Sequence, residues 1–239
     1  MDKKTIIAVM AIVAAFVGLA VFSSIFNKAP DYSQYKLDRI QSLADQIKKE
    51  DLNPDSIYEA SELTSNLPEK TMGDPKTAKV VLYEYADYAC SHCAEWSEYL
   101  DKTVKESDGK LAVVYRGYLL PGFKNSVVAA SAATAAQMQG YWQEYKGQLF
   151  ANQVRWYNAS GNTLKDELVS YFEAASDGKG DTEKFLADME SETVAKRLAF
   201  EYRLGKETDL KGTPTFRLNG ENIEITDLKA TLATELGKY

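Results

Sequence analysis

Residues 79–96 read KVVLYEYADYACSHCAEW, and this stretch decides the fold. Its first eight residues, KVVLYEYA, are β-branched, aromatic and almost continuously apolar, which is typical of a buried central strand. Cys90 and Cys93 follow at the start of a predicted helix. One apolar face of that helix is marked by side chains three or four residues apart, which are Cys93, Trp96, Leu100 and Val104. The stretch therefore predicts a strand, then a helix, with both cysteines at the junction.

The pattern continues outward as an α/β chain. A second buried strand, LAVVYRGYLL, is predicted at residues 111–120, so strand, helix and strand form a βαβ unit with parallel strands. Alanine-rich and other helical segments fill about 122–206. Strands return from Thr213, with Asn219-Gly220 as a two-residue hairpin turn. A final helix follows, for which Thr226 is the predicted N-cap.

Composition and charge narrow the class of protein. The chain has 239 residues, of which 45% are hydrophobic and 26% charged, a balance that supports a globular core. Its net charge is -7 and no long basic run occurs, so we expect no nucleic-acid partner. Two cysteines and one histidine exclude a multi-bridge disulfide scaffold. Cys90, His92 and Cys93 are too close together to share one tetrahedral ion, so we expect no metal and no other cofactor.

The N-terminus predicts a membrane anchor. Residues 5–26 carry no charged side chain and would form a helix about 33 Å long, enough for a hydrocarbon core of about 30 Å. Lys3 and Lys4 precede the segment, which favours a cytoplasmic N-terminus. A cleaved signal peptide is the alternative, but its apolar region is usually only about 7–15 residues long. Either way the rest of the chain is exported, where disulfides persist.

Three regions follow from these patterns. Residues 1–28 form the tail and anchor, 29–70 a juxtamembrane stalk or helix, and 71–239 the main domain, with its helical insertion at about 122–206. In the second region, apolar residues at helical spacing indicate either a helix packed on the domain or a spacer or self-association seam. The apolar repeat covers barely two heptads, which is too short for a coiled coil, so a helix packed on the domain is favoured. Residues 66–76, NLPEKTMGDPK, are typical of a loop, and without a dimerisation module we expect a monomer.

The cysteine pair indicates redox chemistry. We expect Cys90 at the exposed edge of the helix and Cys93 covered one turn later. Unpaired N–H groups and the helix dipole would stabilise a thiolate at Cys90, and His92 would add to this as a donor or a cation. A stabilised thiolate makes the disulfide a stronger oxidant. An inert buried pair is the alternative, but Cys-x-x-Cys at this place in a βαβ unit is a redox pattern.

The chain resembles the thioredoxin superfamily, specifically its DsbA-like thiol oxidoreductases. The likeness covers Met72 to Tyr239, and the stretches that carry it are GDPKTAKVVLYEYADYACSHCAEW, VVYRGYLLP, AASAATAAQMQGYWQEYKGQLFANQ and LKGTPTFRLNG. The resemblance implies a thioredoxin fold, βαβ followed by a β-hairpin and a helix, with an inserted helical domain. It also implies that Cys90 is the attacking cysteine and Cys93 the resolving one.

The resemblance assigns further residues to the site. It makes Pro214 a cis-proline facing the cysteines, with Thr213 before it offering its backbone to a substrate strand. It makes Glu84 a buried acid whose raised pKa suits it to exchange a proton with Cys93; an edge position that reaches solvent is the alternative. Ser91 and His92 tune the pair, although the family often has proline where Ser91 stands.

These features predict an extracytoplasmic, membrane-anchored enzyme. Its Cys90-Ser91-His92-Cys93 pair would introduce disulfides into exported proteins that carry free thiols. A membrane quinone-linked partner of the DsbB or VKOR type would reoxidise the pair. A disulfide reductase or isomerase on the same fold is one alternative. A non-enzymatic module for metal delivery or substrate holding is the other, with a peptide-holding surface built from aromatic residues of the insertion: Tyr141, Trp142, Tyr145, Trp156 and Tyr157.

Overall fold

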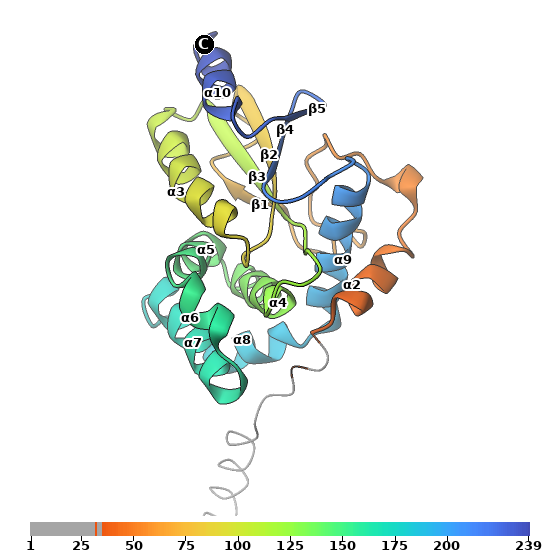
Figure 1. The fold of residues 1–239 in the computed structure, drawn as a ribbon, viewed down its shortest axis with the longest axis vertical. Coiled ribbons are helices and arrows are strands. Elements are labelled where there is room, and N and C mark those ends of the chain that lie inside the picture. The colour runs from red at the N-terminus through yellow and green to blue at the C-terminus, as the bar shows by residue number, and fades with distance from the viewer. Residues whose placement is uncertain (1–31, 33–34) are drawn as a thin grey trace, which may run out of the picture. The chain divides into compact units, whose positions relative to one another are not determined.

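A computed structural model describes Tyr32 and residues 35–239 of the chain. Residues 32–239 form one compact unit (Figure 1). Among the described residues, no helix combines the length and the apolar character needed to cross a membrane. The anchor predicted at residues 5–26 lies outside the described residues.

Within the described part of the chain, the strands form one five-stranded sheet in the order β1-β3-β2-β4-β5. Their bounds are β1 Lys70–Met72, β2 Val80–Ala86, β3 Leu111–Gly117, β4 Thr215–Leu218 and β5 Glu221–Ile223. The central strands β2 and β3 are parallel and are joined by α3 (Ser91–Glu106), as predicted. The predicted hairpin is also confirmed: β4 and β5 are antiparallel, and Asn219 and Gly220 both take the left-handed backbone that a two-residue turn needs.

Both faces of the sheet are buried, which explains the continuous apolar character of β2. Alternate residues of β2 enter two separate cores: Leu82 belongs to one, and Tyr83 and Tyr85 to the other. Helix α3 contributes to the first core together with α10 (Leu228–Leu236). Helix α9 (Glu192–Lys206) contributes to the second, and the two helices α3 and α9 flank the sheet in Figure 1.

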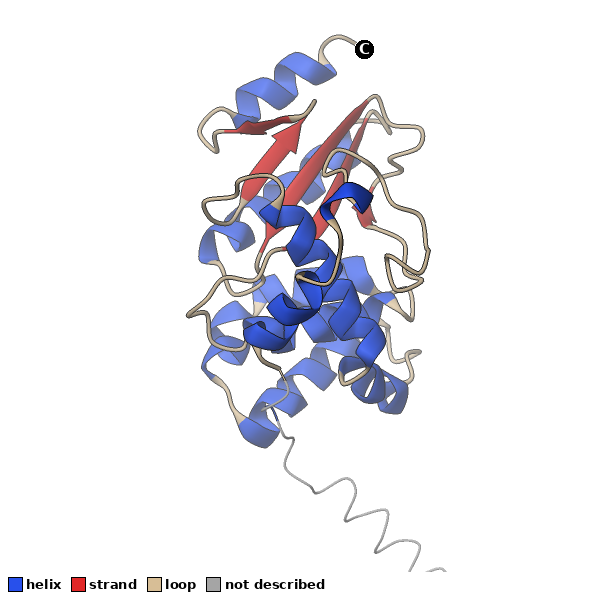
Figure 2. Cartoon of the chain, turned by 90° about the vertical axis from the view of Figure 1, so that its right-hand side faces the viewer, coloured by secondary structure: helices blue, strands red, loops and turns tan. Residues whose placement is uncertain are grey.

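The predicted helical insertion is present between β3 and β4. Its helices are α4 Ser126–Gln137, α5 Trp142–Ala151, α6 Gln153–Asn158, α7 Gly161–Ala175, α8 Thr182–Met189 and α9. The small side chains of the alanine-rich α4 let its neighbours approach closely, so that almost the whole helix is buried. Figure 2 shows a cluster of helices at one end of the sheet. The redox sequence lies where that end of the sheet meets the insertion.

The region before the sheet packs on the domain. Helix α2 (Leu37–Ala44) buries Ile40 and Ala44 and lies against α9, where Gln41 Nε2 donates a 2.8 Å hydrogen bond to the hydroxyl of Tyr202. A short 3-10 helix, η2 (Lys49–Asp51), follows. Residues 37–44 therefore agree with a packed helix rather than a spacer, and they belong to the same compact unit as residues 71–239.

Two local predictions are wrong. Lys70–Met72, predicted as part of a loop, forms β1 on the outer edge of β3. Three residues are too few to show strand periodicity, and the burial of Lys70 depends on an ion pair with Glu201, far along the chain. The last helix begins at Leu228 with Asp227 as its N-cap, one residue later than a Thr226 cap requires.

Candidate active site

The two cysteines lie at the start of α3. Cys90 is the N-cap, with extended backbone, and Cys93 lies one turn inside the helix. Both are free thiols. Cys93 is fully buried, as predicted, but Cys90 is only 5% exposed, less than the exposed edge that was predicted. The reason is the loop before β4, because the Cys90 thiol donates to the carbonyl of Thr213 at 3.2 Å.

Cys90 is held in conditions that favour its thiolate. Hydrogen bonding with the Cys93 thiol makes the largest contribution and lowers the pKa of Cys90 to about 5, against the opposing effect of burial. The backbone N–H groups of Cys93 and His92 contribute in the same direction. These N–H groups are the unpaired donors of the first helical turn, so the predicted effect of the helix N-terminus is present.

Cys93 has the opposite character. Burial, followed by its hydrogen bond to Cys90, raises the pKa of Cys93 well above that of a free thiol. Near neutral pH the reduced pair therefore consists of one thiolate and one thiol. The thiolate is the nucleophile in disulfide exchange, so the geometry suits Cys90 to attack and Cys93 to resolve.

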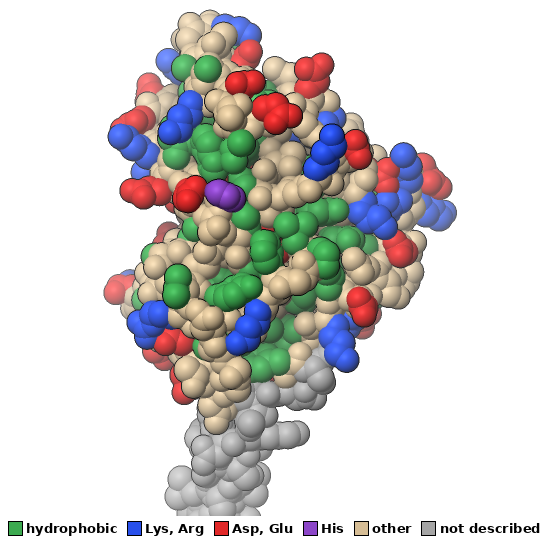
Figure 3. Space-filling view, in the orientation of Figure 1, with side chains coloured by type: hydrophobic (Ala, Val, Ile, Leu, Met, Phe, Trp, Pro, Cys, Tyr) green, Lys and Arg blue, Asp and Glu red, His purple; other side chains and the backbone are tan. Residues whose placement is uncertain are grey.

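The two residues between the cysteines face solvent. Ser91 and His92 are exposed, and the His92 side chain is visible on the surface in Figure 3. Its Nδ1 lies 3.3 Å from Oε2 of Glu95, and the side chain is 69% exposed. What His92 gives to Cys90 is a backbone N–H. The predicted donor or cation at the Cys90 sulfur is thus not the imidazole, which turns toward Glu95 instead.

Glu84 is buried beneath the cysteines, as predicted. It lies in the central strand β2 and is 1% exposed, which rules out the solvent-reaching alternative. Burial raises the pKa of Glu84 to about 7, while the nearby charge of Lys146 opposes this rise. The Oε1 atom of Glu84 has no hydrogen-bond partner, and its carboxylate charge acts on Cys93. Glu84 is therefore a buried acid whose charge raises the pKa of the Cys93 thiol.

A buried lysine of the insertion, Lys146, lies near Glu84 and opposes the rise in its pKa. Lys146 on α5 has a side chain that is only 1% exposed and pairs with Asp101 of α3 at 2.9 Å. It also bonds to Ser97 Oγ at 3.1 Å. The Asp101 side chain is 26% exposed, and with Ser97 it lines an open pocket between α3 and α5. Asp101 therefore links the buried ammonium of Lys146 to this open pocket.

The loop before β4 closes the other side of the pair. The Thr213–Pro214 peptide bond is cis, as the resemblance implied. Both residues are half-buried, and the Thr213 carbonyl is the group that meets Cys90. The hydroxyl of Thr213 is buried and has no partner. Thr213 thus lies beside Cys90 through its carbonyl, and the cis peptide bond to Pro214 follows it directly.

Two residues that the sequence analysis did not select also hold the site. Asp87, three residues before Cys90, is fully buried. Gln153, at the start of α6, donates through its amide to the carbonyls of Tyr88, at 2.7 Å, and Cys90, at 3.0 Å. A charged residue between two buried segments was a signal for Asp87, whereas nothing in the sequence places Gln153 at the cysteines.

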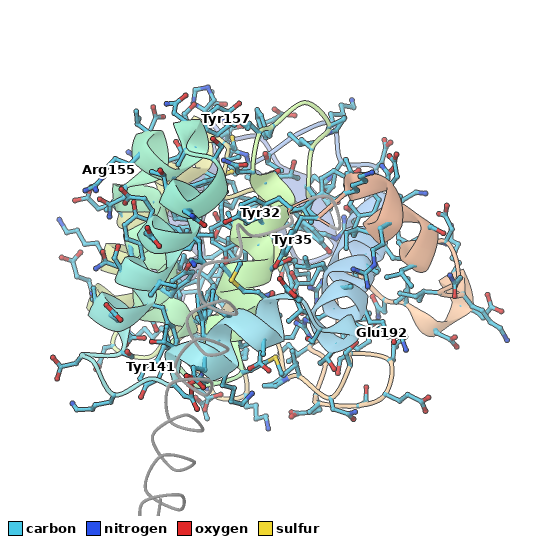
Figure 4. The ribbon with its side chains drawn as sticks, turned by 90° about the horizontal axis from the view of Figure 1, so that it is seen from below. Tyr32, Tyr35, Tyr141, Arg155, Tyr157 and Glu192 are labelled. Carbon is cyan, nitrogen blue, oxygen red and sulfur yellow. The ribbon has the colours of Figure 1, made fainter. Side chains whose placement is uncertain are left out.

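The aromatic residues of the insertion are mostly core. Three of the five proposed for a peptide-holding surface are buried: Trp142, Tyr145 and Trp156. The other two, Tyr141 and Tyr157, lie on opposite sides of the insertion in Figure 4 and form no joint surface. For metals, no group of three or more His, Cys, Asp or Glu side chains could hold an ion within Tyr32 and residues 35–239.

A sequence model of the thioredoxin family matches residues 65–234. The Na(+)/H(+) antiporter NhaA of Herminiimonas arsenicoxydans is 29% identical over 149 residues, covering 62% of this chain and 22% of that protein. The antiporter NhaA 1 of Mycobacterium sp. (strain KMS) is 30% identical over 154 residues, with 62% and 23% covered. This chain spans less than a quarter of the length of those relatives, so the likeness concerns one part of them.

Solved structures share the fold. A thioredoxin-like oxidoreductase from Silicibacter pomeroyi DSS-3 is 25% identical with a TM-score of 0.55, over 72% of this chain and 95% of that one. Oxidised BdbD from Bacillus subtilis has a TM-score of 0.60 at 19% identity, with 76% and 97% covered. MdbA, a thiol-disulfide oxidoreductase from Actinomyces oris, has a TM-score of 0.54 at 20% identity, with 71% and 87% covered. The chain therefore belongs to the thioredoxin family, and its structural neighbours there are DsbA-like thiol-disulfide oxidoreductases.

Proposed function

We propose that this thioredoxin-family oxidoreductase donates disulfide bonds to exported proteins on the extracytoplasmic side of a membrane. The observation that carries the proposal is the asymmetry of the pair: the pKa of Cys90 is lowered to about 5, mainly by its hydrogen bond with Cys93, while burial raises that of Cys93. A stabilised thiolate favours the reduced form, and a protein whose reduced form is favoured is an oxidant.

The reaction follows from this asymmetry. In the disulfide form, a substrate thiolate attacks Sγ of Cys90, the Cys90–Cys93 bond breaks, and Cys93 leaves with the electron pair. Glu84 supplies the proton that the buried Cys93 sulfur then needs. A second substrate thiolate attacks the substrate sulfur of the mixed disulfide and releases Cys90 as a thiolate. The substrate is oxidised by two electrons and the pair is reduced by two.

The partners and location belong to the same proposal. Substrates are exported proteins with free thiols, and their extended backbone docks beside Thr213 and Pro214. Residues 5–26 anchor the chain, with the N-terminus in the cytoplasm. A membrane quinone-linked protein of the DsbB or VKOR type returns the pair to the disulfide. The monomer is the working unit, and Cys90 and Cys93 act without a cofactor.

Disulfide transfer to a reduced, unfolded protein with two cysteines tests the proposal. The full-length chain, oxidised and held in detergent micelles, should form the substrate disulfide and accumulate as the dithiol, detected by thiol labelling. The control is the same protein reduced beforehand. A pair that stays oxidised in the presence of excess substrate thiols contradicts the oxidase proposal. Selective rearrangement of a scrambled substrate would favour the isomerase alternative.

A further inference from the structure

The helical insertion reaches the redox loop, residues 87–90, through a buried carboxylate. Asp87 is fully buried at the end of β2. Its Oδ1 accepts from the backbone N–H of Ala89 at 2.9 Å. Its Oδ2 accepts from the N–H of Leu120 at 2.9 Å and from the hydroxyl of Ser126 at 2.7 Å. Two of the three donors thus belong to the connection into the insertion and to the first residue of α4.

The backbone of Asp87 meets both cysteines. Its carbonyl accepts from the N–H of Cys90 at 3.0 Å, and its backbone hydrogen bond with Cys93 acts on that thiol. The side chain therefore ties the insertion to a residue whose backbone contacts both Cys90 and Cys93. A change in the charge of this carboxylate acts at the start of α3, where the Cys90 thiolate forms.

The surroundings of Asp87 let its charge respond to that of Cys90. Burial raises the pKa of Asp87 to about 6, its hydrogen bonds oppose the rise, and the nearby charge of Cys90 adds to it. The other ionisable groups around it are Cys93 of α3 and Tyr115 of β3. Glu84 lies three residues earlier in β2. Glu201 of α9 accepts from Gly117, which is paired with Ala86. No cation occurs in this set.

We propose that Asp87 is a positioning residue whose carboxylate opposes the Cys90 thiolate and makes the oxidising strength of the pair depend on pH. In the disulfide form Cys90 is uncharged, and Asp87 ionises readily. Reduction by two electrons places a negative charge on Cys90 and a proton on Cys93. At mildly acidic pH, Asp87 then takes one further proton from solvent, which removes the repulsion. This inference rests on the Cys90 thiolate, but not on the direction of disulfide transfer in the cell.

The test is a thiolate titration by ultraviolet absorbance of the reduced full-length protein in detergent micelles, with no substrate present. The wild type should titrate in a broadened, two-step curve, because two interacting acids share their protons. Asp87→Asn should titrate in one step at lower pH. Its equilibrium with glutathione should move several-fold toward the reduced protein and lose a pH-dependent step near pH 6. Asp181→Asn, the same change at the N-cap of α8, should match the wild type.

The outcomes separate this inference from a structural role and from the proposed function. An Asp87→Asn protein that keeps the wild-type titration and glutathione equilibrium overturns the inference. If that variant does not fold, Ser126→Ala keeps the charge and removes one donor to it, so the second step should move to higher pH; an unmoved step also overturns the inference. If the thiolate titration behaves as expected but the protein does not donate disulfides to the substrate, only the oxidase proposal is contradicted.

Discussion

Glu84→Gln should remove a pH dependence from the stability of the fold. The pKa of Glu84 is raised by burial from 4.5 to about 7. Between these values the unfolded chain has lost the proton that the folded chain keeps, so the free energy of unfolding falls as pH rises. Each pKa unit corresponds to about 1.4 kcal/mol, so the loss reaches about 3 kcal/mol above pH 7. Glutamine keeps the shape of the side chain and cannot ionise, so the variant should not lose this stability.

The assay is urea unfolding of the oxidised wild type and variant at a series of pH values from 5 to 8. The oxidised form is used because its cysteines do not titrate. The difference in unfolding free energy should grow in favour of the variant as pH rises, and should level off above pH 7. Glu98→Gln, the same change at an exposed residue of α3, should follow the wild type. Parallel curves for wild type and Glu84→Gln would refute the assignment of Glu84 as a buried acid.

Three further changes probe the site. Cys93→Ser, mixed with a substrate that already carries a disulfide, should accumulate mixed disulfides that are visible on non-reducing gels. The Cys90 thiolate attacks the substrate disulfide, and no Cys93 thiol remains to displace the bound substrate; free turnover would contradict the assigned roles. His92→Leu should shift the pKa of Cys90 less than Asp87→Asn does. The His92 side chain is 69% exposed, and only its backbone N–H reaches the Cys90 sulfur. A larger shift in the thiolate titration would show that the imidazole acts directly on Cys90. Lys146→Met should raise the pKa of Glu84 further, because the charge of Lys146 opposes the rise. An unchanged pKa of the Glu84 carboxyl, followed by NMR, would show that the charge of Lys146 does not act on Glu84.

The parts of the fold that could be predicted are those that depend on the local sequence pattern. The apolar run before Cys90 predicted a central strand, and Asn219-Gly220 predicted the hairpin. Both are present. Strand β1 was missed, since three residues carry no period and Lys70 suggests an exposed turn. Its burial depends on Glu201, 131 residues away, a pairing that no local pattern shows.

The residues of the site also fall into two groups, those indicated by a motif or a resemblance and those placed only by tertiary contacts. The redox pattern led to Cys90 and Cys93, and resemblance led to Glu84 and Pro214. Lys146 was missed because a lysine on an amphipathic helix is usually solvated, and only the tertiary structure places it against Asp101. Gln153 reaches the carbonyl of Cys90 across 63 residues of chain. Contacts made by the insertion depend on how its helices dock, and this is why the sequence did not indicate them.

The equilibrium constant of the Cys90–Cys93 couple with glutathione tests the central claim most directly. The full-length protein in detergent micelles, incubated with defined ratios of reduced and oxidised glutathione, yields a reduction potential from its fraction of dithiol. A stabilised Cys90 thiolate predicts a potential above about -180 mV, in the range of proteins that donate disulfides. A value near about -270 mV, typical of a reductant such as thioredoxin, would contradict the claim that this chain is an oxidase.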